Sequence, residues 1–333
     1  MACIAGLDLS VGLAMHLLGR VNGDSPSSLD HRPDTVKLQP MPVAKTGAPL
    51  RPMLALVGGA IAIGFAPVFV RWSEVGLNAT AFWRLALALP ALWLLARRSS
   101  AEPLVPARGR GLLALAGLFF ALDLCFWHAS IALTSVANAT LLANLTPLVV
   151  VLFYWFVRGQ RPTLGFSLGA GLALAGAAGL ALSTVTPAGT GAGDVLLGDA
   201  YGVSTAFAYA GYLLAVERAR ATGSGLQVTL ASTAAAMVVT GGVALAFGEN
   251  FWPASGAGWA VLVGLALLVH VIGQGGIVWA LGQLPASLSS VVILIQPLVA
   301  AGLGWLWLGE GLGPLDALCA ALVLGGVLIC RRR

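Results

Sequence analysis

The sequence predicts an all-α integral membrane protein with ten transmembrane helices, arranged as two tandem five-helix repeats of inverted topology. Three observations support this fold class. Of the 333 residues, 58% are hydrophobic and only 9% are charged, whereas about 25% of the residues of a soluble domain are charged. The mean hydropathy is +0.91, and the apolar residues fall into runs long enough to cross a bilayer. The two halves of the chain also share residues at one constant offset.

The apolar runs set the number of expected helices. An α-helix needs about 20 apolar residues to cross the hydrocarbon core, because it rises 1.5 Å per residue through about 30 Å. Backbone groups in lipid must find hydrogen-bond partners within their own segment, so these runs are expected to be helical. The expected spans are 53–70, 79–96, 111–131, 137–157, 164–184, 196–216, 225–247, 257–280, 287–308 and 312–330.

The first 52 residues differ from the rest of the chain. From Gly23 to Pro49 they are polar and rich in proline, and they contain no run long enough to span a bilayer. The stretch before Gly23 lacks a basic start and is interrupted by Asp8, which is unlike a signal peptide. We therefore expect a disordered cytoplasmic arm at 1–52, a first repeat at 53–184 and a second repeat at 196–330.

The arginines predict the orientation in the membrane. With the N-terminus inside, the expected cytoplasmic loops and the C-terminal end hold eleven arginines, and the opposite loops hold one, Arg71. Lysine and arginine are enriched on the cytoplasmic side of inner-membrane proteins. The pattern predicts a multi-pass protein of the inner (plasma) membrane with both termini cytoplasmic. It also explains the net charge of +5 without a nucleic-acid partner.

Several kinds of chemistry have no motif in the sequence. No G-x-x-x-x-G-K-[ST] loop is present, and both lysines, Lys37 and Lys45, lie in the N-terminal arm. No HExxH or GxSxG pattern occurs, and the four cysteines do not have the spacing of metal ligands. We therefore expect no cofactor, no metal and no ATP-driven step.

An internal repeat links the two halves of the chain. Placing 132–176 over 282–326, an offset of 150, matches Pro147 with Pro297, and it also matches Trp155 with Trp305, Gly159 with Gly309 and Gly176 with Gly326. Each repeat holds five expected helices, an odd number, so the second repeat must enter the membrane from the opposite side. Inverted repeats of this kind are typical of secondary transporters.

Short motifs in both halves add a family resemblance. They are Ser135-Val136-Ala137-Asn138-Ala139, Leu145-Thr146-Pro147-Leu148, Leu284-Pro285-Ala286-Ser287, Gln296-Pro297-Leu298 and Gly309-Glu310. Together they resemble the drug/metabolite transporter superfamily, EamA type, over roughly 53 to 330. Arg84 resembles the arginine that this family carries in its second helix. The first repeat has Gln160 where the family usually has an acidic residue, so Glu310 alone can fill that carboxylate's role.

Asp123 is the strongest candidate for a substrate-binding residue. It lies twelve residues after Gly111, about 18 Å along the expected helix and near the midplane of the bilayer. At the i−3 and i+4 positions of the same face stand Phe120 and Trp127. A carboxylate between two aromatic rings suits a zwitterionic or cationic amphipath. The structural alternative is a hydrogen bond from Asp123 to a neighbouring helix.

His270 and Gln274 form a second polar group at a comparable depth. The offset of 150 places Asp123 over Gly273, about one turn from His270, so the two groups are near symmetry mates. Transporters with inverted repeats bind substrate at such a position, and His270 could also carry a coupled proton. The alternative is a structural hydrogen bond. His128 is expected near the outer interface, where solvent explains it.

Pro147 and Pro297 predict matching irregularities in the fourth and ninth helices. A proline within a helix removes one backbone hydrogen bond and frees the carbonyl four residues earlier. Asn144 and Gln296 stand close to the two prolines and could line the same cavity. A tolerated kink and a hinge beside the substrate are both compatible with the pattern. Arg84, near the outer end of the second helix, could snorkel or contact the substrate.

These observations favour a secondary transporter that exports small metabolites, above all amino acids, across the inner membrane by alternating access. The acidic, aromatic-flanked centre favours amino acids, and the resemblance includes amino-acid exporters of the family. The expected partners are a small-molecule substrate, a coupled proton and the lipid bilayer. The alternatives are a drug or nucleotide-sugar carrier and, from another class, an intramembrane enzyme.

Overall fold

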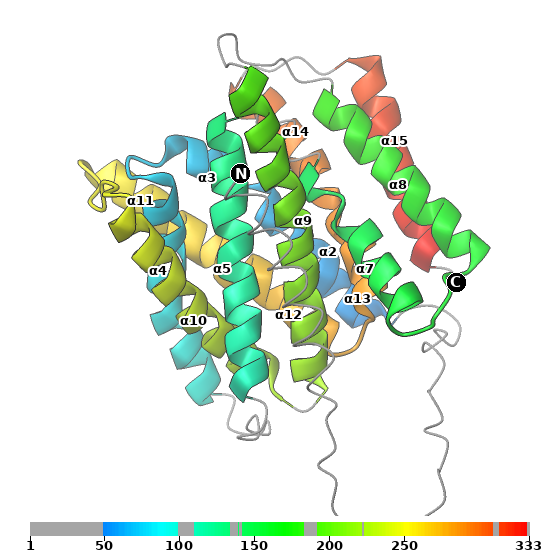
Figure 1. Cartoon of the computed structure of the whole chain (residues 1–333), viewed down its shortest axis with the longest axis horizontal. Coiled ribbons are helices and arrows are strands. Elements are labelled where there is room, and N and C mark those ends of the chain that lie inside the picture. The colour runs from blue at the N-terminus through cyan, green and yellow to red at the C-terminus, as the bar shows by residue number, and fades with distance from the viewer. Residues whose placement is uncertain are drawn as a thin grey trace, which may run out of the picture. The chain divides into compact units, whose positions relative to one another are not determined.

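The computed structural model describes residues 49–98, 110–133, 139, 142–182, 192–221, 223–308 and 313–331. The expected N-terminal arm and Glu310 lie outside the described residues, apart from the last few positions of the arm. Helices make up most of the described chain (Figure 1). Those of the first half are α2 (Leu50–Gly64), α3 (Ala66–Trp72), α4 (Leu77–Arg98), α5 (Arg110–Leu133), α7 (Thr146–Phe156) and α8 (Leu164–Leu182). Those of the second half are α9 (Ala192–Arg220), α10 (Gly225–Ala246), α11 (Gly256–Gly264), the π-helix η2 (Leu265–Gln274), α12 (Gly275–Leu281), α13 (Ala286–Ile293), α14 (Ile295–Leu308) and α15 (Pro314–Arg331).

All ten expected spans overlap described helices, but not all of these meet the length and hydropathy of a membrane span. Within the described ranges, seven segments are long and apolar enough: Leu50–Trp72, Leu77–Arg98, Arg110–Leu133, Gly225–Ala246, Gly256–Leu281, Ala286–Leu303 and Pro314–Arg331. The helix α7 and the apolar part of α8 are shorter, and α9 carries charged side chains in its first and last turns. The protein is therefore an all-helical multi-pass membrane protein, and the count of ten stays a prediction.

The packing of the helices is nearly the same when the two halves are exchanged. The helix α5 packs along α9, as η2 and α12 pack along α2. Likewise α5 contacts α10 as η2 contacts α4, and α7 contacts α9 as α13 and α14 contact α2. Three further pairs, α4 with α10, α8 with α15 and α7 with α13, join equivalent helices of the two halves. This pattern is expected of two structurally related repeats; their inverted orientation stays a prediction.

Three of the expected spans are interrupted near a proline. Phe65 separates α2 from α3, and Pro67 lies in the first turn of α3, where proline has no backbone hydrogen bond to lose. Leu145 precedes α7 and Leu294 separates α13 from α14. The offset of 150 places Leu145 over Ile295, one residue from Leu294, so these two breaks nearly correspond. The sequence predicted irregularity at Pro147 and Pro297, and the first break was not predicted.

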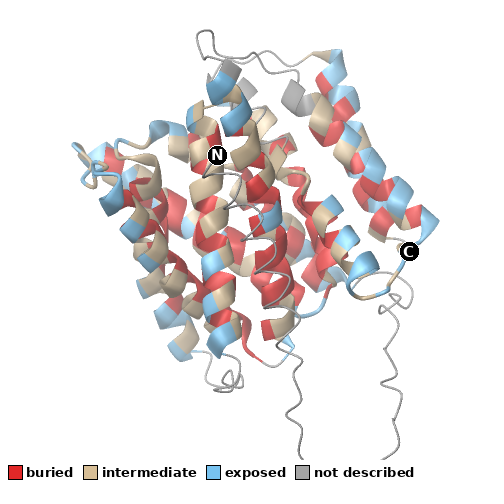
Figure 2. Cartoon of the chain, viewed as in Figure 1, coloured by how far each residue is buried: buried red, intermediate tan, exposed pale blue. Residues whose placement is uncertain are grey.

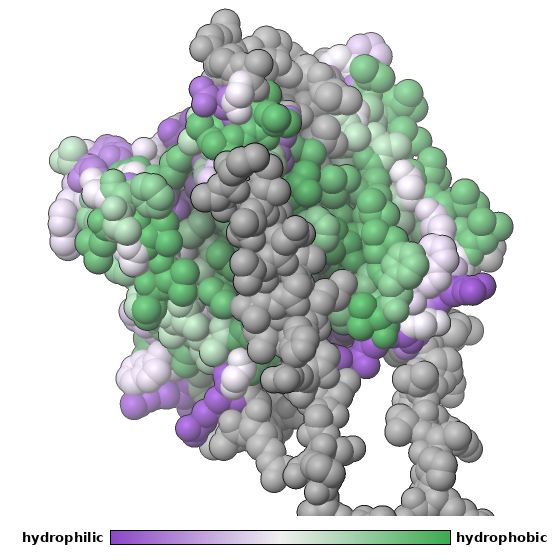
Figure 3. Space-filling model, viewed as in Figure 1, coloured by the Kyte–Doolittle hydropathy of each residue, from purple (hydrophilic) through white to green (hydrophobic). Residues whose placement is uncertain are grey.

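The outward-facing side chains of the bundle are mostly apolar. Figure 2 shows exposed residues along the outer helices and buried residues between helices, and Figure 3 shows a broad hydrophobic surface with hydrophilic side chains toward the helix ends. Contiguous exposed apolar surface of this extent marks a membrane-facing region. The more exposed examples include Leu164, Leu196, Leu245, Phe156, Phe247, Val238 and Leu54.

Two carboxylates join loops from opposite halves. Glu249, after α10, accepts hydrogen bonds from the side chain of Asn78 (2.7 Å) and the backbone N–H of Ala79 (2.8 Å), in the first turn of α4. Glu74, before α4, accepts from the backbone N–H (2.9 Å) and hydroxyl of Ser255, the N-cap residue of α11. Carboxylates at a helix N-terminus satisfy free N–H groups and interact favourably with the helix dipole. The hydroxyl of Ser255 also lowers the pKa of Glu74.

A third carboxylate links α9 to two helices that are broken beside a proline. Glu217 accepts a hydrogen bond from the backbone N–H of Ala286 at the start of α13 (2.8 Å). The hydroxyl of Tyr154 in α7 donates to its other oxygen. The contact therefore connects both halves of the chain near the ends of three helices.

Candidate functional site

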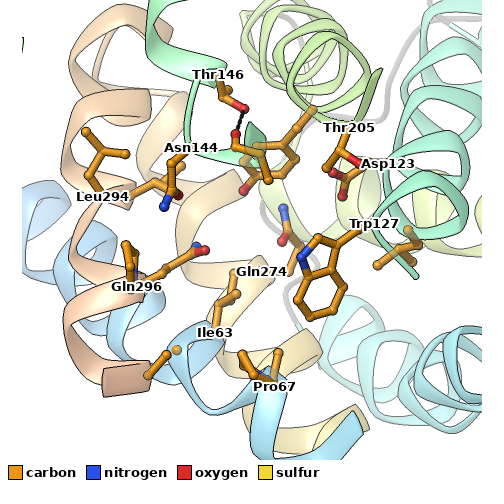
Figure 4. Close-up of a pocket in the computed structure, with 18 of the residues that line it drawn as sticks. Ile63, Pro67, Asp123, Trp127, Asn144, Thr146, Thr205, Gln274, Leu294 and Gln296 are labelled. Carbon is orange, nitrogen blue, oxygen red and sulfur yellow. Dashed lines mark hydrogen bonds between the residues drawn. The ribbon is translucent and has the colours of Figure 1, made fainter. Parts of the chain in front are cut away.

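A cavity of about 120 Å³ lies where the two halves meet. Its walls come from the broken region of α2 and α3, from α4 and α5, from the break before α7, and from α9, η2, α13 and α14. Figure 4 shows Asp123, Trp127 and Gln274 on one side of it and Asn144, Leu294 and Gln296 on the other. The broken helices place backbone groups at this depth, which is tolerated in a membrane protein only where they line a cavity or contact protein.

Asp123, Phe120 and Trp127 all line the cavity, as their spacing on one helical face predicted. Asp123 and Trp127 are half-buried, and Phe120 is fully buried. The ring of Phe120 stacks on Tyr212 of α9 with centroids 4.8 Å apart. This packing fixes the orientation of Phe120, so the wall beside Asp123 is a rigid aromatic surface.

The break before α7 explains how a freed carbonyl is accommodated. Pro147 has no N–H to offer the carbonyl of Ala143, and the hydroxyl of Thr146 donates to that carbonyl instead, at 2.8 Å. The dashed line in Figure 4 marks this bond. Ala143 and its repeat mate Ile293 both line the cavity. The two prolines therefore lie at the cavity, and their role as hinges stays a proposal.

Gly64 allows the break between α2 and α3 to lie close against α14. A Cβ atom on Gly64 would lie 2.6 Å from the Cβ of Val299 and 3.1 Å from the carbonyl oxygen of Gln296. Any side chain here would push the end of α2 away from α14. The absence of a side chain at Gly64 thus allows two interrupted helices to meet beside the cavity.

Three amide side chains contribute neutral polar groups. Asn144, Gln274 and Gln296 line the cavity, as the sequence predicted for Asn144 and Gln296 beside the prolines. The amide nitrogen of Asn144 is buried and has no hydrogen-bond partner among the described residues. Each amide offers both donors and an acceptor, so these side chains can bind either end of a polar ligand.

His270, which the sequence predicted to bind substrate, does not line the cavity. His270 is 1% exposed, its Nε2 is 2.7 Å from the hydroxyl of Thr233, and its ring centroid is 5.6 Å from that of Phe120. His128, which was expected near the outer interface, is buried.

His270 and Gln274, which the sequence placed on one helical face, have different surroundings. Both lie in the π-helix η2 (Leu265–Gln274), in which hydrogen bonds run from i to i+5. Gln274 lines the cavity, whereas His270 contacts the hydroxyl of Thr233 and packs against the ring of Phe120.

Arg84 is inside the bundle and does not snorkel to the surface. It is 4% exposed and lines the cavity with Asp123. Its guanidinium carbon lies 5.8 Å from the centroid of the Phe120 ring. Glu310, the other residue suggested by the family resemblance, lies outside the described residues.

Four polar residues of the wall were not predicted from the sequence: Thr146, Thr205, Tyr209 and Ser290. Thr205 and Tyr209 are four residues apart in α9, so they share one face. This spacing of polar groups within an apolar helix was the available signal. In the part of the chain that the structure describes, no group of three or more His, Cys, Asp or Glu side chains could hold a metal ion.

Comparison with known proteins assigns a family. The sequence pattern of the EamA-like transporter family matches residues 50–182 and 196–332. No curated protein matches the sequence. One solved crystal structure of a protein superposes with a TM-score of 0.70, covering 85% of this chain and 99% of its own, at 20% sequence identity. An identity this low shows a shared fold alone.

Proposed function

Because this chain belongs to the EamA-like transporter family and is therefore a membrane transporter of small molecules, we propose that it exports amino acids. The observation that carries this proposal is the position of Asp123 between Phe120 and Trp127 in a cavity at the junction of the two halves. A carboxylate binds the ammonium group, and the aromatic rings contact an apolar side chain.

The charges of the cavity wall favour amino acids over nucleotide sugars. A nucleotide sugar carries phosphates, which are usually bound by several cationic side chains. Arg84 is the single cationic residue among the described residues of the wall. A nucleotide-sugar carrier is therefore the weaker candidate, and a drug carrier is the alternative that the transport assay separates.

Alternating access is proposed to act through the broken helices. Pro147 and Pro297 lie beside the cavity in both halves, so small backbone rotations at Leu145 and Leu294 would open it toward one side or the other. The hydrogen bonds of Glu249, Glu74 and Glu217 hold the ends of helices together. They would have to break and re-form during this motion. The arginine distribution supports an inner-membrane location with both termini cytoplasmic, and a coupled proton would power export.

The proposal is tested with the purified protein in proteoliposomes and a panel of radiolabelled amino acids, with and without a pH gradient. We expect uptake of at least one amino acid, and we expect Asp123→Asn to abolish most binding and flux. Because Asn is an uncharged isostere and costs less to bury, this variant should express and elute like the wild type. Asp194→Asn, at an exposed position in the first turn of α9, is the matched control.

Two results would contradict the proposal. The first is the absence of transport for the entire panel while a nucleotide sugar or an amine drug is transported. The second is wild-type amino-acid affinity in Asp123→Asn, measured by calorimetry, because it would place the substrate elsewhere in the bundle.

A further inference from the structure

The wall of the cavity holds one residue of each charge. Among the described residues that line it, Arg84 on α4 and Asp123 on α5 are the only ones of a charged type. Under the offset of 150 their counterparts are Ala234 and Gly273. The second half therefore faces the cavity with neutral groups, and both charges come from the first half.

Burial makes a charged group with few hydrogen bonds costly at this position. Arg84 is 4% exposed, and its Nε is buried without a hydrogen-bond partner among the described residues. A guanidinium group has five N–H donors, and the ring face of Phe120 at 5.8 Å offers a cation–π contact but no hydrogen-bond acceptor. Arg84 lines the cavity, so a ligand carboxylate there could accept hydrogen bonds from the guanidinium group.

The two charges together select against ligands with a net charge. An amine without a carboxylate would pair with Asp123, but it would bring a second cation close to Arg84. A carboxylate without an amine would pair with Arg84 and be repelled by Asp123. Like charges in a low-dielectric site repel strongly. A zwitterion matches both groups and leaves the occupied cavity electrically neutral.

We infer that Arg84 forms a carboxylate subsite next to the ammonium subsite at Asp123, so that the substrate must be a free α-amino acid with both ends unmodified. This inference rests on the proposed function and extends it to the recognition of the substrate's carboxylate. Arginine suits this role because its planar guanidinium can donate two parallel hydrogen bonds to a carboxylate. Decarboxylated amines and N-acyl amino acids are then excluded.

The test uses two series of three compounds and the purified full chain. One series is L-phenylalanine, phenethylamine and 3-phenylpropanoate, and the other is L-leucine, 3-methylbutylamine and 4-methylpentanoate. We expect calorimetry to show that each amino acid binds at least about tenfold more tightly than its amine or its acid, because a charge-assisted hydrogen bond is lost in each analogue.

Substitutions at the two charged residues should change this preference in opposite directions. Arg84→Gln should weaken amino-acid binding at least about tenfold and should leave the affinity for the amine unchanged or higher. Asp123→Asn should weaken amino-acid binding and raise the relative affinity for the acid. Arg97→Gln, at the far end of the same helix and outside the cavity wall, is the matched control and should change neither.

The outcomes separate this inference from the proposed function. If neither amino acid binds the wild type, the aromatic-lined amino-acid site itself is wrong. If the amino acid and its amine bind equally, or if Arg84→Gln lowers all three affinities alike, the amino-acid site stands and the carboxylate subsite is refuted. Should Arg84→Gln fail to fold, the wild-type series decides alone, and Arg84→Lys tests whether the paired geometry is needed.

Discussion

Replacing Thr146 by valine removes the hydroxyl that supports the break before α7 and leaves the shape of the side chain almost unchanged. The hydroxyl donates to the carbonyl of Ala143 at 2.8 Å, and Pro147 has no N–H to take its place. Thr146 is 4% exposed, so water cannot readily replace the lost bond. A buried polar group without its partner costs about 1–3 kcal/mol. We expect Thr146→Val to lower the free energy of unfolding by this amount, a factor of roughly 5 to 150 in the ratio of folded to unfolded protein.

Thermal unfolding in detergent compares this variant with Thr146→Ser, which keeps the hydroxyl and loses only a methyl group. The transition of Thr146→Val should lie below that of Thr146→Ser, and its rate of transport should change because the geometry beside Pro147 changes. If the valine variant is as stable as the serine variant, the bond to Ala143 does not support the break. The proposed hinge would then lose its structural basis.

Three further predictions concern the histidine, the membrane topology and the loop contacts. His270→Ala should weaken substrate affinity by loosening Phe120, and it should flatten the pH dependence of transport if His270 carries a coupled proton; unchanged affinity and pH dependence would refute both roles. Single cysteines at Gln160 and Glu310 should react with an impermeant thiol reagent from opposite sides of the membrane, and labelling from one side would refute the inverted repeat. Glu249→Gln should lower the thermal transition, because its contact with the first turn of α4 loses a charge–dipole interaction of about 0.3–1 kcal/mol; a transition equal to that of the wild type would show that the contact adds no stability.

The sequence by itself determined the class of the protein and much of the cavity wall. Membrane-spanning helices follow from local chemistry, because each apolar run satisfies its own backbone hydrogen bonds. The grouping of Phe120, Asp123 and Trp127 needed only the period of an α-helix. The neighbourhood of Pro147 and Pro297 followed from the missing N–H of proline and from the repeat.

The tertiary structure decided the features that depend on residues distant in the chain. The N-terminal contacts of α4 and α11 use Glu249 and Glu74, which lie 170 and 181 positions from their partners, and no local pattern predicts such a pairing. The side chain of Arg84 lines the cavity and is not at the surface, because α10 and η2 pack against α4. The surroundings of His270 were likewise decided by the tertiary structure, because Thr233 and Phe120, which contact it, come from α10 and α5.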